Sequence, residues 1–258
     1  MSQPLTVTEL HGAVMTLRLN RADKKNALNS ELYNGITAAF AEAAANPAVR
    51  VVLMTGTADS FCAGNDIVDF LQNTPTTADD APVMRFMRAM ANFPKPIVTA
   101  VNGLAIGVGV TMLLHSDLVY AAQSAKLQMP FTNIGICPEF ASSLLLPAMM
   151  GHQRAAELTM FGEPFDAQTA REVGIVNAVL PDAELAAFAM ERAQKLAQQP
   201  PNALRTTKAL LKRWPIEQIN EAIPYEASFF MPMLKMPEAI EAMGAFMQKR
   251  KPDFSRFS

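Results

Sequence analysis

The stretch KPIVTAVNGLAIGVGVTMLL, residues 95–114, passes from a β-branched run to an apolar helical pattern across a glycine-containing turn. Its first part predicts a buried strand, and its last part, around VTMLLH, predicts a short helix. Gly103, Gly107 and Gly109 mark the passage between the two. A helix N-terminus presents unpaired N–H groups and the positive end of its dipole, so this turn is suited to hold developing negative charge. Taken alone, the glycines are equally compatible with close core packing.

Two other interpretations of this stretch are disfavoured. A dinucleotide-binding fingerprint requires a third glycine at the position where the chain has Met112. The uncharged run between Pro96 and Leu114 is long enough to raise the question of a membrane span. However, it contains Thr99, Asn102 and three glycines, and we therefore expect no membrane association.

Outward from this stretch, predicted strands and helices alternate along the chain. Residues 6–10 and 13–19 predict a hairpin, residues 30–45 a helix capped by Asn29, and residues 49–56 a buried strand. Residues 71–82 predict a surface loop, residues 83–93 a helix, and residues 117–122 and 126–129 two strands. After Asp182 the pattern is helical, with QQPP at 198–201 as the clearest break. The alternation predicts an α/β fold with parallel strands.

The composition predicts a globular protein that acts on small molecules. The chain has 258 residues, of which 50% are hydrophobic and 18% charged, with a net charge of -2 and a pI near 6.0. It can bury a substantial core and has no general attraction to nucleic acid or anionic membranes. Two cysteines without a CxxC pair and three scattered histidines predict neither a disulfide framework nor a metal site. The seventeen methionines are read as adaptable core filler, with the alternative that some of them line a ligand pocket.

The expected location is the cytoplasm. The first residues, MSQPLTVTELHG, do not have the charged and apolar regions of a secretory signal, and FSRFS at the other end is not a peroxisomal address. The scarcity of cysteine also fits a reducing compartment.

Two further segments carry candidate chemistry. In SFCAGNDIVDF, residues 60–70, Ala63 and Gly64 let another molecule approach the main chain, although a tight turn explains the same residues. In FTNIGICPEFASS, residues 131–143, Glu139 is a lone carboxylate among apolar residues. It is either an acid–base group or an acidic residue at the start of the helix that follows.

Five segments carry a family resemblance when they are read together: FCAGNDI, KPIVTAVNGLAIGVG, SDLVYAA, IGICPE and FMQKRKPDF. In this order they resemble the enoyl-CoA hydratase/isomerase, or crotonase, superfamily, and the resemblance covers nearly the whole chain. This resemblance implies a spiral of ββα units over residues 1–198 and a helical region, residues 199–258, that builds homotrimers or dimers of trimers. It also implies an acyl-CoA thioester substrate, with no metal and no cofactor beyond the CoA moiety. In the family, two main-chain N–H groups hold the thioester oxygen, and by motif position they belong to Asn65 and Val108.

The resemblance is most specific for one branch of the superfamily. Hydratases use two glutamates, and the corresponding positions here are Thr111 and Phe131, neither of which can transfer protons near neutral pH. PFTNIGICPE matches the segment of peroxisomal-type monofunctional Δ3,Δ2-enoyl-CoA isomerases, which places Glu139 at the catalytic position. A single base there would move a proton from C2 to C4. The alternatives are an enzyme for another acyl-CoA, such as an aromatic-degradation intermediate, and a non-catalytic acyl-CoA-binding protein.

The resemblance also implies a set of CoA contacts, for which a solvated charged turn or a basic tail is the competing interpretation. His115 and Asp117 are interpreted as structural, and no nucleophilic role is assigned to Cys62 or Cys137, because no histidine partner is evident. The implied CoA-binding residues are Lys24, Lys25, Ala27, Leu28, Ala63, Gly64, Asp66, Ile67, Phe246 and Lys249.

Overall fold

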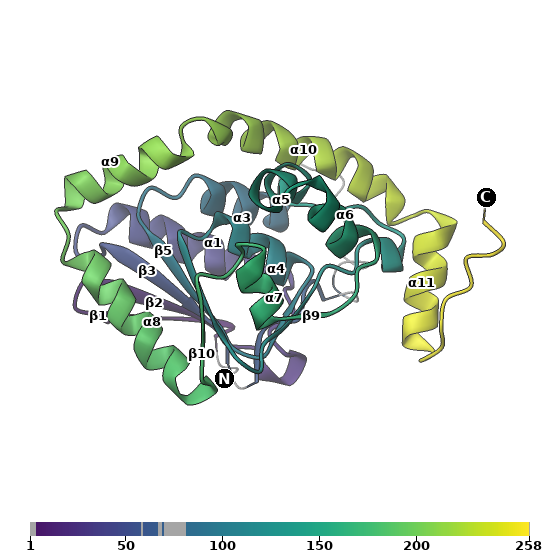
Figure 1. The fold of residues 1–258 in the computed structure, drawn as a ribbon, viewed down its shortest axis with the longest axis horizontal. Helices are drawn as coiled ribbons and strands as arrows, with labels where there is room; N and C mark the ends of the chain where they lie inside the picture. Colours follow the sequence, from purple (N-terminus) through teal and green to yellow (C-terminus); the bar gives the residue numbers. More distant parts are fainter. Residues whose placement is uncertain (1–3, 58, 67–68, 70–80, 258) are drawn as a thin grey trace.

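A six-stranded sheet forms the centre of the fold in the computed structural model, which describes residues 4–57, 59–66, 69 and 81–257 (Figure 1). The first two strands form the predicted antiparallel hairpin, and every other neighbouring pair is parallel. In spatial order the strands are β1 (Thr6–His11), β2 (Val14–Leu19), β3 (Val51–Thr55), β5 (Ile97–Val101), β7 (Leu118–Ala122) and β10 (Ala178–Leu180).

Both faces of the central strands β3, β5 and β7 are buried, which explains why these strands are apolar runs in the sequence. The hairpin strand β1 is largely exposed and alternates polar and apolar residues. Val52 and Met54 of β3 pack in the larger core with helices α1 (Ser30–Ala45) and α3 (Pro82–Ala91). Val51 and Leu53 pack on the opposite side against α8 (Asp182–Ala197). Successive strand residues point to opposite faces, so one β-branched run supplies both clusters.

A second, four-stranded sheet consists of β4 (Ser60–Cys62), β6 (Leu104–Ile106), β8 (Lys126–Gln128) and β9 (Phe165–Asp166), in that order. The chain passes from β3 to β4, from β5 to β6 and from β7 to β8, so each pass adds one strand to each sheet before a helix follows. This repetition is the predicted spiral of ββα units. The sequence did not predict β4, β6, β9 or β10, because two or three residues are too few to show an alternating pattern.

The remaining elements surround these sheets. Helices α9 and α10 run along one side of the core, and α11 lies near the C-terminus (Figure 1). The predicted helical region after residue 199 is therefore present, and α10 packs against α3 and α5. The bounds are η1 (Ala22–Lys24), α4 (Val108–Thr111), η2 (Met112–His115), η3 (Thr132–Ile134), α5 (Ser142–Met150), α6 (His152–Met160), α7 (Ala167–Glu172), α9 (Pro201–Lys212), α10 (Pro215–Met233) and α11 (Pro237–Met247).

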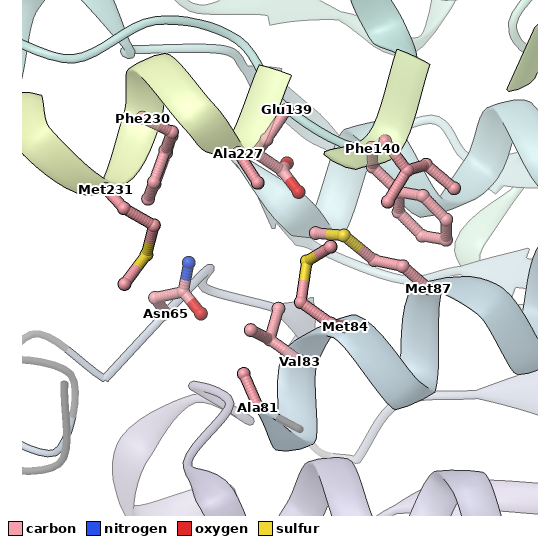
Figure 2. A pocket seen from close by; sticks show the side chains of 11 residues that line it. Asn65, Ala81, Val83, Met84, Met87, Glu139, Phe140, Ala227, Phe230 and Met231 are labelled. Atoms are coloured by element: carbon pink, nitrogen blue, oxygen red, sulfur yellow. The ribbon is translucent and has the colours of Figure 1, made fainter. Parts of the chain in front are cut away.

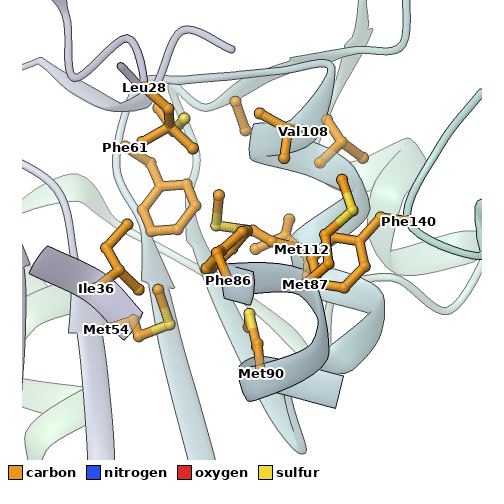
Figure 3. Packing of buried hydrophobic residues seen from close by; sticks show 14 of the residues in the cluster. Leu28, Ile36, Met54, Phe61, Phe86, Met87, Met90, Val108, Met112 and Phe140 are labelled. Carbon is orange, nitrogen blue, oxygen red and sulfur yellow. The ribbon is translucent and has the colours of Figure 1, made fainter. Parts of the chain in front are cut away.

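Methionines contribute strongly to the larger core. Figure 3 shows Met54, Met87, Met90 and Met112 packed among leucine, isoleucine and phenylalanine side chains. An unbranched, flexible thioether fills irregular gaps between such side chains. The prediction of methionine as core filler is confirmed for these residues.

His115 and Asp117 have the structural roles predicted for them. Asp117 accepts a hydrogen bond from the N–H of Ile97 (2.7 Å) and forms an ion pair with Lys208 of α9 (2.7 Å). His115 stacks on Phe140 at 3.9 Å between ring centroids, and burial lowers the pKa of His115 to about 3, so its imidazole is neutral. The predicted loop at residues 71–82 lies, except for Ala81 and Pro82, outside the described residues. Within the described part of the chain, no helix combines the length and the apolar character that a membrane span requires.

Candidate active site

The ends of β4 and β6 bring the two glycine-containing turns together. These strands pair in parallel, and α4 begins directly after the turn that follows β6. Gly107 has φ 53° and ψ -117°, a conformation that side chains disfavour. A Cβ atom at Gly109 would lie 2.6 Å from the carbonyl oxygen of Cys62. Glycine is thus required at 107 for the turn and at 109 for the close approach of α4 to β4.

This arrangement leaves the N–H groups of Asn65 and Val108 without acceptors among the described residues. The N–H of Leu28 donates to the carbonyl oxygen of Gly64, and the N–H of Asp66 donates to the carbonyl oxygen of Leu28, both at 2.8 Å. Asn65 forms an isolated parallel bridge with Leu28, and its N–H, between these two bonds, points away from Leu28. Val108 is the first residue of α4 and has no intrahelical acceptor. Two main-chain donors are therefore available to a ligand oxygen.

Both residues line one cavity of about 350 Å³. Its walls are largely apolar and come from the two turns, the segment around Phe131 and the C-terminal helices. The predicted contact Phe246 of α11 also lines it. The lining residues are Ala63, Gly64, Asn65, Ile106, Gly107, Val108, Gln128, Pro130, Phe131, Ile134, Ile136, Phe230, Leu234, Ala242, Met243 and Phe246.

Glu139 lines a smaller adjoining cavity of about 30 Å³, which shares Asn65 and Phe230 with the larger one. Figure 2 shows the Glu139 carboxylate pointing into this space above Met84 and Met87, with Asn65 across from it. One carboxylate oxygen, Oε1, accepts a hydrogen bond from the Thr111 hydroxyl at 2.6 Å. The other, Oε2, is buried and has no hydrogen-bond partner among the described residues. Oε2 is thus the oxygen available to a substrate.

The environment of Glu139 changes its acidity. Burial raises the pKa of Glu139 to about 8, the hydrogen bond from Thr111 opposes this rise, and the charge of Glu226 adds to it. A carboxyl group with such a pKa can both accept and donate a proton near neutral pH.

The structure contradicts the alternative interpretation of Glu139 as the acidic group at a helix start. Helix α5 begins at Ser142, and the carboxylate at its N-terminus is that of Glu226 in α10, which accepts hydrogen bonds from the N–H groups of Ala141 and Ser143. Sequence reasoning missed Glu226, which is 83 positions or more from these partners, and it gave Thr111 no positive role. The side chain of Glu139 is therefore free to face the cavity.

A phenol supports the side chain of Asn65. The Tyr33 hydroxyl donates to Oδ1 of Asn65 at 2.6 Å. Burial, together with the nearby charge of Glu139, raises the pKa of Tyr33 well above its ordinary value, so this group stays protonated. The contact holds the Asn65 turn against α1.

The predicted CoA contacts near the N-terminus lie beside the Asn65 turn and do not line the cavities. Lys24 and Lys25 are exposed and Leu28 is buried. The carboxylate of Asp66 forms an ion pair with Arg21 at 2.7 Å, which ties this segment to the turn. The CoA-binding roles of these residues, of Ala27 and of the exposed Lys249 stay predictions, and Ile67 lies outside the described residues.

The raised pKa of Glu139 predicts a pH-dependent stability difference. The folded protein binds the Glu139 proton more tightly than the unfolded chain does, because the pKa is about 8 in the folded state and 4.5 in the unfolded state. The contribution of this proton to the free energy of unfolding is therefore complete below about pH 4.5 and is lost as the pH rises through 8. Relative to Glu139→Gln, the wild type should lose about 2–4 kcal/mol of unfolding free energy over this range. Urea unfolding at about pH 5 and about pH 8.5 measures the difference. If the free energy of unfolding changes equally in the two proteins between these pH values, burial does not raise the pKa of Glu139.

The fold is an α/β spiral, and its cavities bring two main-chain N–H donors close to a buried carboxylate. This combination defines an enzyme for acid–base chemistry on a substrate that develops negative charge on an oxygen atom. Residues 9–256 match the family model described as Enoyl-CoA hydratase/isomerase. The chain belongs to this family, and it is an acyl-CoA enzyme of the crotonase superfamily.

Individual relatives cover most of the chain. It is 32% identical to 1,2-epoxyphenylacetyl-CoA isomerase of Escherichia coli (strain K12), over 96% of this chain and 97% of that protein. It is 32% identical to enoyl-CoA delta isomerase 2 of Rattus norvegicus, over 97% of this chain and 65% of that protein. The solved structure of OdaA from Pseudomonas aeruginosa matches with a TM-score of 0.92 and 46% identity, over 95% of this chain and 99% of that one. The crotonase fold is confirmed.

Proposed function

We propose that the protein is a Δ3,Δ2-enoyl-CoA isomerase that uses Glu139 as its single proton shuttle. The observation that carries the proposal is the Glu139 carboxylate, buried in the cavity that shares Asn65 with the main-chain donor site. Similarity to the rat enoyl-CoA delta isomerase supports it.

The reaction requires one base and one site for negative charge. Oε2 of Glu139 removes a proton from C2 of a 3-enoyl-CoA, and the electron pair spreads over C2, C4 and the thioester oxygen as a dienolate. The N–H groups of Asn65 and Val108 donate hydrogen bonds to that oxygen, an effect worth about 3–4 kcal/mol per donor. Glu139 then returns the proton to C4, and the double bond lies between C2 and C3. Atoms and charge balance without a redox step.

The residues at the two hydratase positions favour isomerisation over water addition. Thr111 has its hydroxyl directed to Glu139, and Phe131 is a buried wall residue of the larger cavity. Neither side chain can deprotonate a water molecule near neutral pH. Glu139 therefore acts without a second carboxylate from these positions.

Other parts of the proposal follow from the family. We propose that the substrate's CoA moiety is the only cofactor-like group, that the chain assembles as a homotrimer or a dimer of trimers, and that it acts in the cytoplasm in fatty-acid degradation. Exposed apolar side chains on the C-terminal helices, such as Leu211, Trp214 and Phe229, support burial of this face between subunits.

A second candidate is an isomerase for an aromatic acyl-CoA. Similarity to the Escherichia coli 1,2-epoxyphenylacetyl-CoA isomerase, over almost the full length of both chains, favours it. The aromatic and sulfur-containing side chains of Phe230, Met84 and Met87 around the Glu139 cavity are compatible with an aromatic acyl group.

A paired assay separates these possibilities. Purified protein is given a trans-3-enoyl-CoA and a trans-2-enoyl-CoA, with conjugation followed by absorbance and water addition by mass. Conjugation without hydration is the expected result, and hydration would overturn the single-base proposal. Turnover of an aromatic epoxyacyl-CoA alone would favour the second candidate, and CoA-ester binding without any turnover would favour a binding protein.

Replacing Thr111 tests how Glu139 is tuned. In Thr111→Val the hydrogen bond to Oε1 is lost, so the pKa of Glu139 should rise further. Activity at neutral pH should fall about 10-fold, with the midpoint of the pH profile moved to higher pH. Steady-state rates between about pH 6 and 9.5 measure the shift. Thr159→Val is the matched control, because the Thr159 hydroxyl donates to the carbonyl oxygen of Ala155 within α6 and to no other described residue.

A further inference from the structure

The turn that carries Glu139 is held in an unfavourable conformation. The two residues after Glu139 are Phe140 and Ala141, with φ values of 61° and 56°. Consecutive left-handed residues with side chains are uncommon, and they persist only where surrounding contacts fix them. The direction of the Glu139 side chain therefore depends on what fixes this turn.

Side-chain hydrogen bonds to Glu226 help to fix this turn. Glu226 is 5% exposed, and its carboxylate accepts from the N–H of Ala141 at 2.6 Å and from the N–H of Ser143 at 2.9 Å. These two donors bind different oxygens, and the Ser143 hydroxyl also donates to Glu226. On the other side, the carbonyl oxygen of Phe140 lies 2.8 Å from Nε2 of His115.

Helix α10 connects this turn to the cavity wall. The same helix provides Ile223, Ala227, Phe230 and Met231 to the lining of the Glu139 cavity, three of which Figure 2 labels. All four lining residues lie within five positions of Glu226, so one short segment of α10 provides both the wall against the acyl group and the contact with the turn. The position of α10 thus determines where the carboxylate of Glu139 lies relative to a bound substrate.

We propose that Glu226 is a positioning residue of the reaction, which aims the Glu139 carboxylate by clamping the left-handed turn at Phe140 and Ala141. This proposal rests on the proposed isomerase function. In this proposal Glu226 does not contact the substrate, because each of its carboxylate oxygens accepts a hydrogen bond from an N–H of the turn.

Glu226→Gln is the most direct test. An amide has one acceptor oxygen, so its NH₂ group must face one of the two N–H donors that the carboxylate now satisfies. The turn should loosen and misplace Glu139. We expect kcat to fall about 100-fold while KM changes by less than about 3-fold, since small displacements of a reacting group cost rate more than binding.

The pH profile gives a readout that a merely structural role would not change. The charge of Glu226 raises the pKa of Glu139, so its removal should move the midpoint of the kcat profile to lower pH. Three other titratable groups near Glu139 stay neutral over the assay range, because burial raises the pKa of Tyr33 and Cys62 and lowers that of His115. Burial also raises the pKa of the Cys137 thiol and of the Glu226 carboxyl group.

Two further variants keep the outcome decisive. Ser143→Ala removes one donor and keeps the charge, so it should lower kcat about 5-fold without the pH shift, even if Glu226→Gln fails to fold. Glu221→Gln changes an exposed carboxylate of the same helix and should behave as wild type. Thermal unfolding is measured for each variant.

The outcomes separate this proposal from the proposed function. Wild type without isomerase activity would refute the function. If the wild type is active and the Glu226→Gln variant has the same kcat and the same pH midpoint, the positioning role is refuted, whatever the unfolding temperature of the variant. A lower kcat with unchanged KM and a lower pH midpoint would support it.

Discussion

Glu139→Gln should lower kcat for 3-enoyl-CoA isomerisation by about 1,000-fold, within the range for loss of a general acid–base group. Glutamine has nearly the same shape and its amide oxygen can still accept the hydrogen bond from Thr111, so the cavity should be preserved. The amide cannot take a proton from C2 near neutral pH. KM should stay within about 3-fold of wild type, because the thioester donors at Asn65 and Val108 are unchanged.

The measurement is the steady-state rate as a function of pH. In the wild type, ionisation of Glu139 should raise the rate through a midpoint near pH 8, because the base is the ionised form and its pKa is raised to about 8. This limb should be absent in the residual activity of Glu139→Gln. Glu221→Gln, an exposed carboxylate, serves as the control. Unchanged activity in the Glu139→Gln variant would exclude Glu139 as the proton shuttle.

Gly109→Ala should lower kcat about 100-fold, comparable to the loss of one oxyanion donor. The new Cβ would lie 2.6 Å from the carbonyl oxygen of Cys62, closer than such atoms approach, and 3.1 Å from its Cβ, which is a tight contact. The start of α4 must then move away from β4, which displaces the N–H of Val108. Folding should also be weakened by about 1–3 kcal/mol, as for other overpacked sites.

The matched control is Gly244→Ala in α11, where an added Cβ would meet nothing within 4 Å. That change should be neutral or slightly stabilising, because alanine favours helix more than glycine does. Activity, unfolding in urea and the affinity for a non-reactive acyl-CoA are measured for both variants. Loss of stability with full kcat in Gly109→Ala would show that the N–H of Val108 does not take part in the reaction.

The agreement between sequence and structure is best where the signal is local. The hairpin of β1 and β2, the cap of α1 at Asn29 and the buried strands β3 and β5 all follow from periodicity and capping residues within short windows. The requirement for glycine at 107 is local too, because it comes from one unusual pair of dihedral angles. The requirement at 109 is not local, because it comes from the close approach of Cys62 in β4. Short strands such as β9 lie below the length at which alternation can be read.

The sequence by itself determined the alternation of strands and helices, the motifs that mark the two turns, and Glu139 as the carboxylate to consider. Only the tertiary structure decided how that carboxylate is used. Burial raises the pKa of Glu139, and Thr111 and Glu226, which are 28 and 87 positions away along the chain, lower and raise it in turn. Thr111 also donates the hydrogen bond to Oε1. No pattern of helix or strand period connects such residues. Their meeting depends on the tertiary packing that brings α4 and α10 against the segment of Glu139, which the order of residues along the chain does not display.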